Sequence, residues 1–257
     1  MPEGASTPLQ SGCVETYDEI DSTNSEAMRR ALAGEKGPVW VRADVQTQGR
    51  GRSGRTWVSP RGNLYATLLF APQCMPGTVH QLSLLAGIAV YDTIGSVDTV
   101  PSGLRLKWPN DVLVGGAKVA GVLAESVIGQ GGTPLVLLGI GINLVSAPAQ
   151  SALAATHLSA HGSDLEPAAA LASLDTAISR WLTVWDRGNG FATIRAAWLE
   201  RTGPEGETLA INSAGGRVEG RFAGLDADGS LLLRDGEGRA RRFTFGDVTV
   251  VATPYGA

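Results

Sequence analysis

The feature that most constrains the fold is a change of pattern near Thr202-Gly203-Pro204. Beyond it, short runs of β-type composition are separated by clusters of turn residues, such as 226–229 and 235–238. Strands so short and so closely spaced are too few for a β-sandwich but suit a small closed barrel. The sequence therefore predicts a five-stranded β-barrel over residues 204–257. Its expected strands lie at 208–211, 217–225, 230–234, 241–245 and 248–251.

Residues 14–203 have a different pattern, in which helical and strand periods alternate. Thr23 and Glu26 fit the capping box S/T-x-x-E, which predicts a helix from Thr23 to a terminating Gly34. Apolar residues at helical spacing predict two further helices, at 82–94 and 171–185. The fold class is therefore α+β, with a flexible tail at 1–13, a large domain at 14–203 and the barrel after it. The strands expected in the large domain are 39–45, 64–70, 104–108, 112–114, 119–127 and 135–144.

The composition excludes several classes of protein. Hydrophobic residues make up 43% and charged residues 18% of the 257, which excludes a disordered or coiled-coil chain. The net charge of −4 argues against a protein that coats nucleic acid. No signal-peptide segment is visible, and no apolar run approaches the roughly 18 residues of a membrane span. Cys13 and Cys74 form no disulfide framework, so we expect a cytoplasmic protein with reduced thiols.

One short segment, residues 49–55, concentrates arginine and glycine. Its sequence is GRGRSGR, and it follows an expected strand. Glycine lets the backbone fold closely around a ligand, and arginine offers a planar fork for phosphate or carboxylate. Taken alone, the segment fits an anion-binding loop, a solvated basic loop or an arginine-rich contact to nucleic acid.

Three polar positions stand at the ends of, or inside, apolar strands. Asn110 and Asp111 follow Pro109 at a strand corner, where both residue types also favour turns for purely structural reasons. A hairpin of the observed length returns Lys118 to the neighbourhood of Asp111. Lys118 is then either a surface lysine or a buried cation that meets an anion. The glycines at 139 and 141 indicate close approach by a ligand or another backbone.

In this order and spacing the segments resemble those of biotin protein ligases. The resemblance runs from about residue 14 to the end of the chain, and it implies a mixed-sheet catalytic domain of the biotin/lipoate ligase type with helices packed on it. It also implies that the C-terminal barrel is SH3-like. The matching motifs are DSTN at 21–24, GRGRSGRTW at 49–57, KWPND at 107–111, GAKVAGVLAES at 116–126 and GIGIN at 139–143.

The resemblance implies an ATP-dependent reaction in two steps. Biotin's carboxylate is joined to the α-phosphate of ATP with release of pyrophosphate, and the biotinoyl group then passes to a lysine of a biotin carboxyl carrier protein. Hydroxyl and amide groups suit the small, neutral ureido ring of biotin. The positions that match biotin-binding residues are Ser22, Thr23, Asn24, Gln46, Arg50, Gly51, Arg52 and Lys118.

The same resemblance assigns cations to the reacting groups, because carboxylate and triphosphate repel each other. Arg52, Lys118 and Asp111 match catalytic positions, and Trp57 is placed to stack on adenine. Mg²⁺ is expected with ATP. The role of Asp111 stays open between positioning Mg²⁺ or water and orienting the lysine. The positions that match nucleotide-binding residues are Arg55, Trp57, Lys107, Asn110 and Asn143.

Two further expectations follow. Because the first motif begins at Ser22, no room remains for the DNA-binding domain that many relatives carry, so the resemblance is to the class without a repressor role, and no DNA or membrane partner is expected. Residues 47–61 are expected to act as a lid that orders on ligand. The alternatives are a lipoate or octanoate protein ligase of the same superfamily, and a non-enzymatic nucleic-acid or interaction protein that uses the arginine loop and the barrel.

Overall fold

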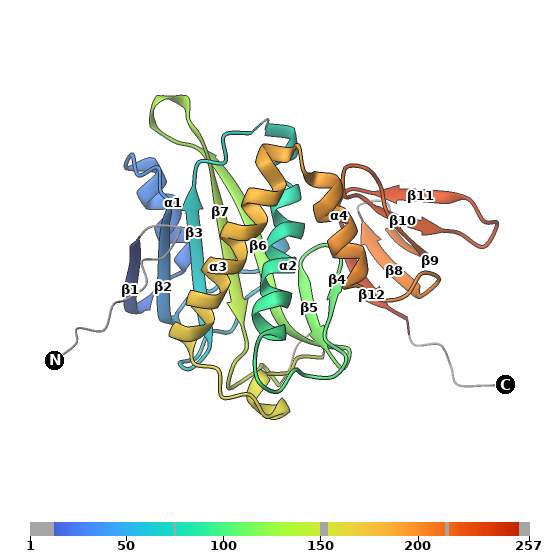
Figure 1. Ribbon diagram of the computed structural model, residues 1–257, viewed down its shortest axis with the longest axis horizontal. Helices are drawn as coiled ribbons and strands as arrows, with labels where there is room; N and C mark the ends of the chain where they lie inside the picture. Colours follow the sequence, from blue (N-terminus) through green and yellow to red (C-terminus); the bar gives the residue numbers. More distant parts are fainter. Residues whose placement is uncertain (1–12, 75, 150–153, 214–215, 252–257) are drawn as a thin grey trace.

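The computed structural model describes residues 13–74, 76–149, 154–213 and 216–251, so most of the tail expected at 1–13 lies outside the described residues. A seven-stranded mixed sheet forms the centre (Figure 1). Its strand order is β1-β2-β3-β7-β6-β5-β4, in which β1 runs parallel to β2 and every other pairing is antiparallel. The strands are β1 Cys13–Ile20, β2 Val39–Gln46, β3 Leu64–Phe70, β4 Arg105–Lys107, β5 Asp111–Val114, β6 Ala117–Ile128 and β7 Pro134–Ile142.

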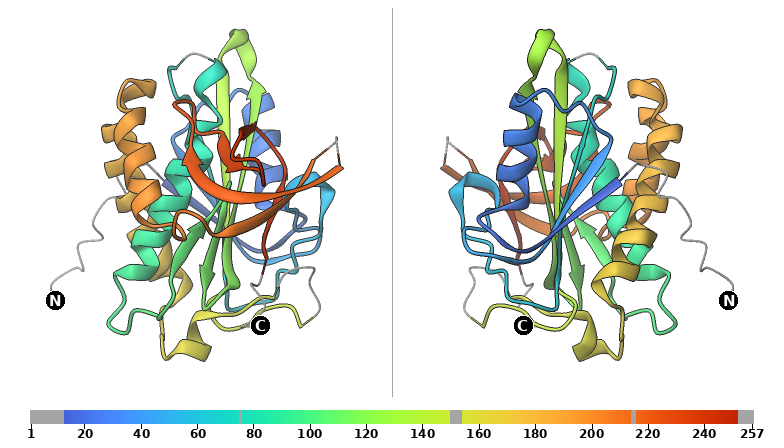
Figure 2. Two further views of the ribbon diagram at one scale, coloured as in Figure 1. Left: turned by 90° about the vertical axis from the view of Figure 1, so that its right-hand side faces the viewer. Right: turned by 90° about the vertical axis from the view of Figure 1, so that its left-hand side faces the viewer.

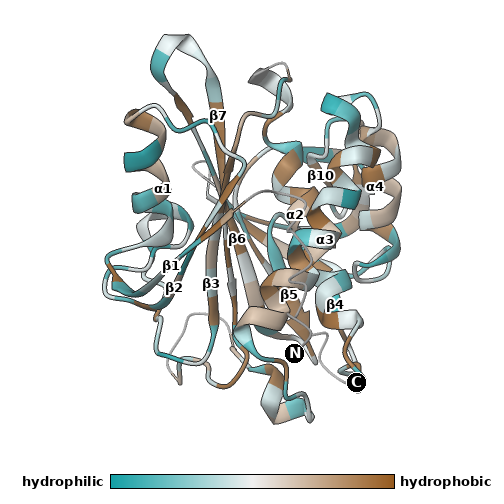
Figure 3. Ribbon diagram, turned by 60° about the vertical axis from the view of Figure 1, so that its left-hand side comes forward, coloured by the Kyte–Doolittle hydropathy of each residue, from teal (hydrophilic) through white to brown (hydrophobic). Residues whose placement is uncertain are grey.

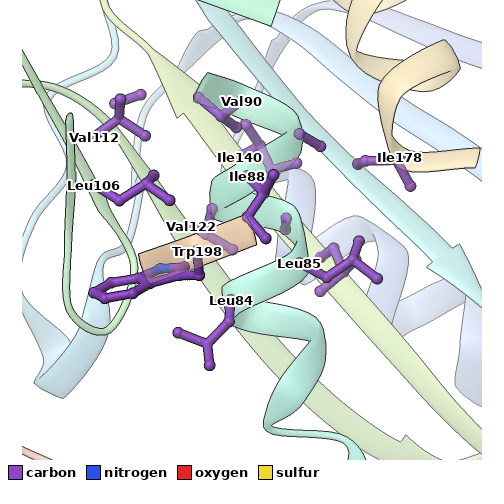
Figure 4. Close-up of a cluster of buried hydrophobic side chains, with 14 of the residues drawn as sticks. Leu84, Leu85, Ile88, Val90, Leu106, Val112, Val122, Ile140, Ile178 and Trp198 are labelled. Atoms are coloured by element: carbon purple, nitrogen blue, oxygen red, sulfur yellow. The ribbon is translucent and has the colours of Figure 1, made fainter. Parts of the chain in front are cut away.

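Helices cover the two faces of this sheet unequally. Helix α1 (Thr23–Leu32) lies on one face, and α2 (Gln81–Gly95), α3 (Pro167–Trp185) and α4 (Phe191–Glu200) lie on the other (Figure 3). The larger core fills the side of α2, α3 and α4, where strand residues such as Val122 and Ile140 meet Ile88 and Trp198 (Figure 4). A smaller core joins α1 to β2, β3 and β7. None of the helices in the described ranges is both long and apolar enough to cross a bilayer.

A five-stranded antiparallel sheet forms the C-terminal part of the chain. Its order is β11-β10-β9-β8-β12, and it lies beyond β4 at one end of the large sheet (Figures 1 and 2). The indole of Trp108 donates to the carbonyl of Gly229, and Arg105 pairs with Glu207 at 2.7 Å, so both ends of the Arg105–Trp108 segment contact turns of the C-terminal part. Its strands are β8 Thr208–Ser213, β9 Gly216–Leu225, β10 Leu231–Arg234, β11 Ala240–Phe243 and β12 Asp247–Val250.

The α+β class and the five C-terminal strands are confirmed, whereas two elements were missed and one local prediction is wrong. Strand β1 was missed because it buries residues at a spacing near three rather than two. Helix α4 was missed although Phe191, Ile194 and Trp198 have helical spacing. The capping box does not form: Ser22 is the N-cap without a side-chain bond, and Glu26 pairs with Arg29 and Arg30 instead.

Candidate active site

A cavity of about 660 Å³ opens between the central strands, the 49–58 loop and the start of β12. Strands β6 and β7 supply its floor, and the N-terminus of α1 closes one end. Every site residue that the sequence predicted lies on its wall. These residues are Ser22, Thr23, Asn24, Gln46, Arg50, Gly51, Arg52, Arg55, Trp57, Lys107, Asn110, Asp111, Lys118 and Asn143.

Neutral polar groups occupy the end of the cavity beside α1. Gln46 Oε1 accepts from both the backbone N–H (2.8 Å) and the hydroxyl (3.1 Å) of Thr23. The hydroxyl of Thr67 lies 2.8 Å from Thr23 Oγ1 and 2.6 Å from Asn24 Oδ1. Because Thr23, Asn24 and Thr67 are almost completely buried, these contacts lock the side chains in one arrangement. We call Thr23, Asn24, Gln46 and Thr67 the neutral cluster.

A glycine in β7 makes room for the neutral cluster. A Cβ atom placed on Gly139 would lie 1.9 Å from Asn24 Oδ1, which is an impossible contact. The amide group of Asn24 therefore rests directly on the backbone of β7. On its other side Asn24 Nδ2 donates to Glu125 Oε2 at 2.8 Å. The same carboxylate oxygen lies 3.4 Å from a guanidinium nitrogen of Arg50, so Glu125 connects the arginine loop to Asn24.

The opposite end of the cavity is charged. Asp111 begins β5, and its two carboxylate oxygens bind two lysines: Oδ1 lies 2.5 Å from Lys118 Nζ, and Oδ2 lies 2.9 Å from Lys107 Nζ. Burial alone would raise the pKa of the Asp111 carboxyl, but the charges of Lys118 and Lys107 outweigh burial and hold that pKa below its usual value. With Arg52, which faces Asn110 beside it, these residues form the charged cluster, in which three cations outnumber one carboxylate.

The hairpin between β5 and β6 brings Lys118 to Asp111, as the spacing predicted. Gly115 and Gly116 form the turn with φ of 58° and 84°, values that favour glycine. Lys118 is mostly buried, with 23% of its side chain exposed, so it is not a surface lysine. Its ammonium group also lies 5.1 Å from the centre of the Trp57 ring, within the range of a cation–π contact.

The arginine loop, residues 49–57, is folded over the cavity. The N–H of Gly51 donates to the carbonyl of Arg55, and the N–H of Trp57 donates to that of Gly49, so the loop closes on itself. The Trp57 ring then lies on the paired glycines of β6 and β7: Cβ atoms on Gly121 and Gly141 would come within 3.3 and 2.7 Å of it. The indole N–H of Trp57 is buried and has no hydrogen-bond partner among the described residues.

Both asparagines predicted near the nucleotide are held by the protein. Asn110 Nδ2 donates to the carbonyl of Val122, and its Oδ1 accepts from Arg52 at 3.1 Å. Burial lowers the pKa of the Arg52 guanidinium, while Asp247 and Asp111 oppose this effect. Asn143 donates to the carbonyl of Thr156 at 3.0 Å. These bonds fix Arg52 and the segment after β7 relative to the charged cluster.

The sequence missed Thr67, Glu125 and the contacts of the loop with the C-terminal sheet. Thr67 is a small polar residue in the mostly apolar strand β3, and Glu125 alternates with Gly121 and Leu123 on β6, so both had a usable signal. The contact of the loop with the C-terminal sheet had none. Arg55, which was expected near the nucleotide, pairs with Asp247 at 2.6 Å.

Comparison with known proteins agrees with this geometry. Residues 18–143 match the biotin/lipoate A/B protein ligase family, and residues 206–251 match the biotin protein ligase C-terminal domain. The chain is 41% identical to the biotin–[acetyl-CoA-carboxylase] ligase of Paracoccus denitrificans, over 85% of this chain and 93% of that one. It is 34% identical to the ligase of the same name from Mycobacterium tuberculosis, over 90% and 86%.

A solved structure gives the same result. The biotin protein ligase from Aquifex aeolicus in complex with biotin and ATP superimposes with a TM-score of 0.79 at 28% identity, covering 93% of this chain and 99% of that one. A mixed sheet followed by a small antiparallel sheet is thus shared with a ligase that binds biotin and ATP, and the fold and the family models together define a biotin/lipoate protein ligase. The chain belongs to the biotin protein ligases within that class.

Proposed function

We propose that this protein activates biotin with ATP and transfers the biotinoyl group to a lysine of a biotin carboxyl carrier protein. The observation that carries the proposal is the union of two different polar surfaces in one cavity. The neutral cluster offers amide and hydroxyl groups to an uncharged polar ring, and the charged cluster offers three cations to anions. A substrate with a ureido ring at one end and a carboxylate at the other fits this order.

In the first step the carboxylate of biotin attacks the α-phosphorus of ATP, and pyrophosphate leaves. Lys118 and Arg52 would neutralise the negative charge that carboxylate and phosphate bring together, which is the main barrier to this displacement. Asp111 would orient rather than react, because each of its oxygens already binds a lysine. Trp57 would exclude water from the mixed anhydride and present its unpartnered N–H to an acceptor of the ligand.

In the second step the amine of a carrier lysine attacks the activated carbonyl, an amide bond forms and AMP leaves. The charges that stabilised the developing phosphate in the first step also stabilise AMP as the leaving group. Two relatives are named biotin–[acetyl-CoA-carboxylase] ligase, and we propose the biotin carboxyl carrier of such a carboxylase as the acceptor here.

Mg²⁺ would enter with the nucleotide rather than on a protein site. No group of three or more His, Cys, Asp or Glu residues that could hold a metal exists among the residues with described positions. Asp111 fits poorly as a direct ligand, because both of its oxygens are engaged by ammonium groups. The phosphate oxygens of ATP and water supply the ligands that Mg²⁺ prefers.

The decisive experiment measures pyrophosphate release from ATP with biotin, lipoate or octanoate as the acid. Release that requires biotin, followed by mass addition to a purified carrier domain, supports the proposal. Release with lipoate or octanoate in preference to biotin would instead support the lipoate ligase alternative. We also propose a cytoplasmic location for the enzyme, because Cys13 and Cys74 are free thiols.

We further propose that this protein does not act as a repressor. The net charge is −4, and the arginines of the 49–55 loop are engaged with Glu125, Asn110 and Asp247. Gel-shift assays with the promoter of its own biotin genes should therefore show no biotin-dependent shift at physiological salt. A tight, biotin-dependent shift would contradict this proposal.

A further inference from the structure

Three cations of the catalytic domain converge on three consecutive residues of the C-terminal sheet. Arg52 donates to the carbonyl of Gly246 at 3.2 Å, and Lys107 donates to the carbonyl of Val248 at 2.7 Å. Between them, the carboxylate of Asp247 pairs with Arg55 at 2.6 Å. Asp247 and Val248 therefore line the cavity although they belong to another sheet, and Gly246 directly precedes them.

Only one of these three acceptors is a side chain. The other two are main-chain carbonyl groups, that of Val248 within β12 and that of Gly246 in the turn before it, where Gly246 has φ of 145° and a Cβ would lie 2.6 Å from the Ile211 side chain. The Asp247 carboxylate, in contrast, depends on the residue present at that position. The Asp247 carboxylate binds the side chain of Arg55, and the main-chain carbonyl of Arg55 accepts the hydrogen bond from Gly51 that closes the arginine loop. Asp247 therefore holds the loop at the residue where it closes.

We propose that Asp247 is a positioning residue that latches the 49–57 loop in its closed position over the reaction intermediate. The inference rests on the proposed function, since the intermediate is biotinoyl-AMP. Arg55 and Asp247 are both partly exposed, with 48% and 40% of their side chains accessible, so the ion pair is a weak one. A pair of this kind shifts an equilibrium by about twofold to fivefold. The C-terminal sheet thus sets how often the lid opens.

The test compares Asp247→Ala with a matched control, Glu207→Ala. Glu207 makes another arginine–carboxylate pair between the large domain and the C-terminal segment, at 2.7 Å with Arg105, and it is not among the described contacts of the loop. Hydrogen exchange at the N–H groups of Gly51 and Trp57 reports loop opening without any need for catalysis. A single-turnover experiment reports the escape of labelled biotinoyl-AMP.

In Asp247→Ala we expect exchange at these amides and escape of the intermediate to rise together by about twofold to fivefold. Asp247→Glu, which keeps the charge, should restore most of the protection, and Glu207→Ala should change neither readout. Should Asp247→Ala fail to fold, Asp247→Asn removes the charge without changing the shape. Unchanged loop exchange in a folded Asp247 variant, or an equal rise in Glu207→Ala, would overturn the proposal. If wild type forms no biotinoyl-AMP, the proposed function fails, while the exchange readout still decides whether Asp247 holds the loop.

Discussion

The two ends of the cavity are polar in opposite ways. In the neutral cluster the hydrogen bonds among the four members join uncharged groups, with Gln46 Oε1 accepting from Thr23 and Thr67 donating to Asn24 or Thr23, and only the bond from Asn24 to Glu125 at its border reaches a charged group. In the charged cluster Lys107, Lys118 and Arg52 surround the single carboxylate of Asp111. One end is therefore preorganised before ligand arrives, whereas the other holds an excess of positive charge that favours the binding of an anion.

The difference indicates that the two ends contribute to different steps, one to binding and the other to the reaction. Preorganised neutral hydrogen bonds select a ligand by shape and contribute to its affinity. Cations that are held together without sufficient counter-charge stabilise the state with the most negative charge near them. That state is the transition state in which the carboxylate meets the phosphate. Substitutions at the neutral end should accordingly change biotin affinity, and substitutions at the charged end should change the rate of activation.

The largest effect is expected for Lys118→Ala. Loss of the ammonium group should slow biotinoyl-AMP formation by roughly 10²- to 10³-fold, the usual effect of removing one donor to a developing negative charge. Asp111 keeps Lys107 as a partner, so the melting temperature should change little. Biotin-dependent pyrophosphate exchange measures the rate, and near-normal turnover would contradict the role of Lys118.

Asp111→Asn should destabilise the protein, because it leaves two ammonium groups without a counter-charge. We expect a loss of about 3 kcal/mol in the free energy of unfolding at pH 7. The folded pKa of Asp111 is lowered, so its stabilising contribution is present above the unfolded carboxyl pKa of about 3.9 and is lost as the pH falls through the folded value. The gap between wild type and variant should therefore close below about pH 4.

Urea unfolding between pH 7 and pH 3 measures this gap. Glu219→Gln is the control, because Glu219 forms an exposed pair with Arg217 and its loss should cost less than about 1 kcal/mol. A gap that is equally wide at pH 3 would show that Asp111 does not stabilise the fold through its charge.

Gly139→Ala tests the neutral end. The added Cβ would displace the Asn24 amide from its contacts with Thr67 and Glu125, and biotin affinity should fall by about 10- to 100-fold. Gly141→Ala is the matched control, because its Cβ meets the Trp57 ring rather than Asn24. Calorimetric titration with biotin measures both variants, and equal losses would break the distinction between the two ends.

Arg52→Ala should give the smallest change, about tenfold in the rate of activation. The variant should also release its intermediate faster, because Arg52 joins the loop to Asn110 and to the C-terminal sheet. Free biotinoyl-AMP would then acylate lysines of bystander proteins. Single-turnover release and streptavidin blots measure this loss, with Arg61→Ala as the control outside the cavity. Retention of the intermediate as in wild type would contradict the lid.

The sequence predicted the α+β fold class and the meeting of Lys118 with Asp111, whereas the roles of the site residues stay predictions. Lys118 and Asp111 could be brought together because a hairpin has a fixed return distance, and the resemblance placed the neutral cluster at Thr23 and Asn24. Strand β1 escaped because an edge strand with one neighbour buries few side chains, so its pattern is weak.

Contacts between distant segments could not be predicted at all. Whether Arg55 meets a nucleotide or Asp247 depends on how two sheets pack, and no local period encodes that. The capping box shows the reverse case, in which a correct local pattern lost to a tertiary one. The hydroxyl of Thr23 makes hydrogen bonds with Gln46 and Thr67, so it is not available to cap its own helix.

The three hydrogen-bond acceptors at residues 246–248 also determine which substitutions the C-terminal segment tolerates there. The main-chain carbonyl groups of Gly246 and Val248 accept hydrogen bonds from two of the three cations. Any residue with the same backbone conformation offers the same carbonyl group. In a saturation mutagenesis library selected for biotin-dependent growth, Val248 should accept other β-branched residues freely. Tolerance at Gly246 should be limited by its positive φ and its contact with Ile211, and position 247 should be the one that prefers acidic residues. The sequence of the second domain would then be constrained by backbone conformation at positions 246 and 248 and by side-chain charge at position 247.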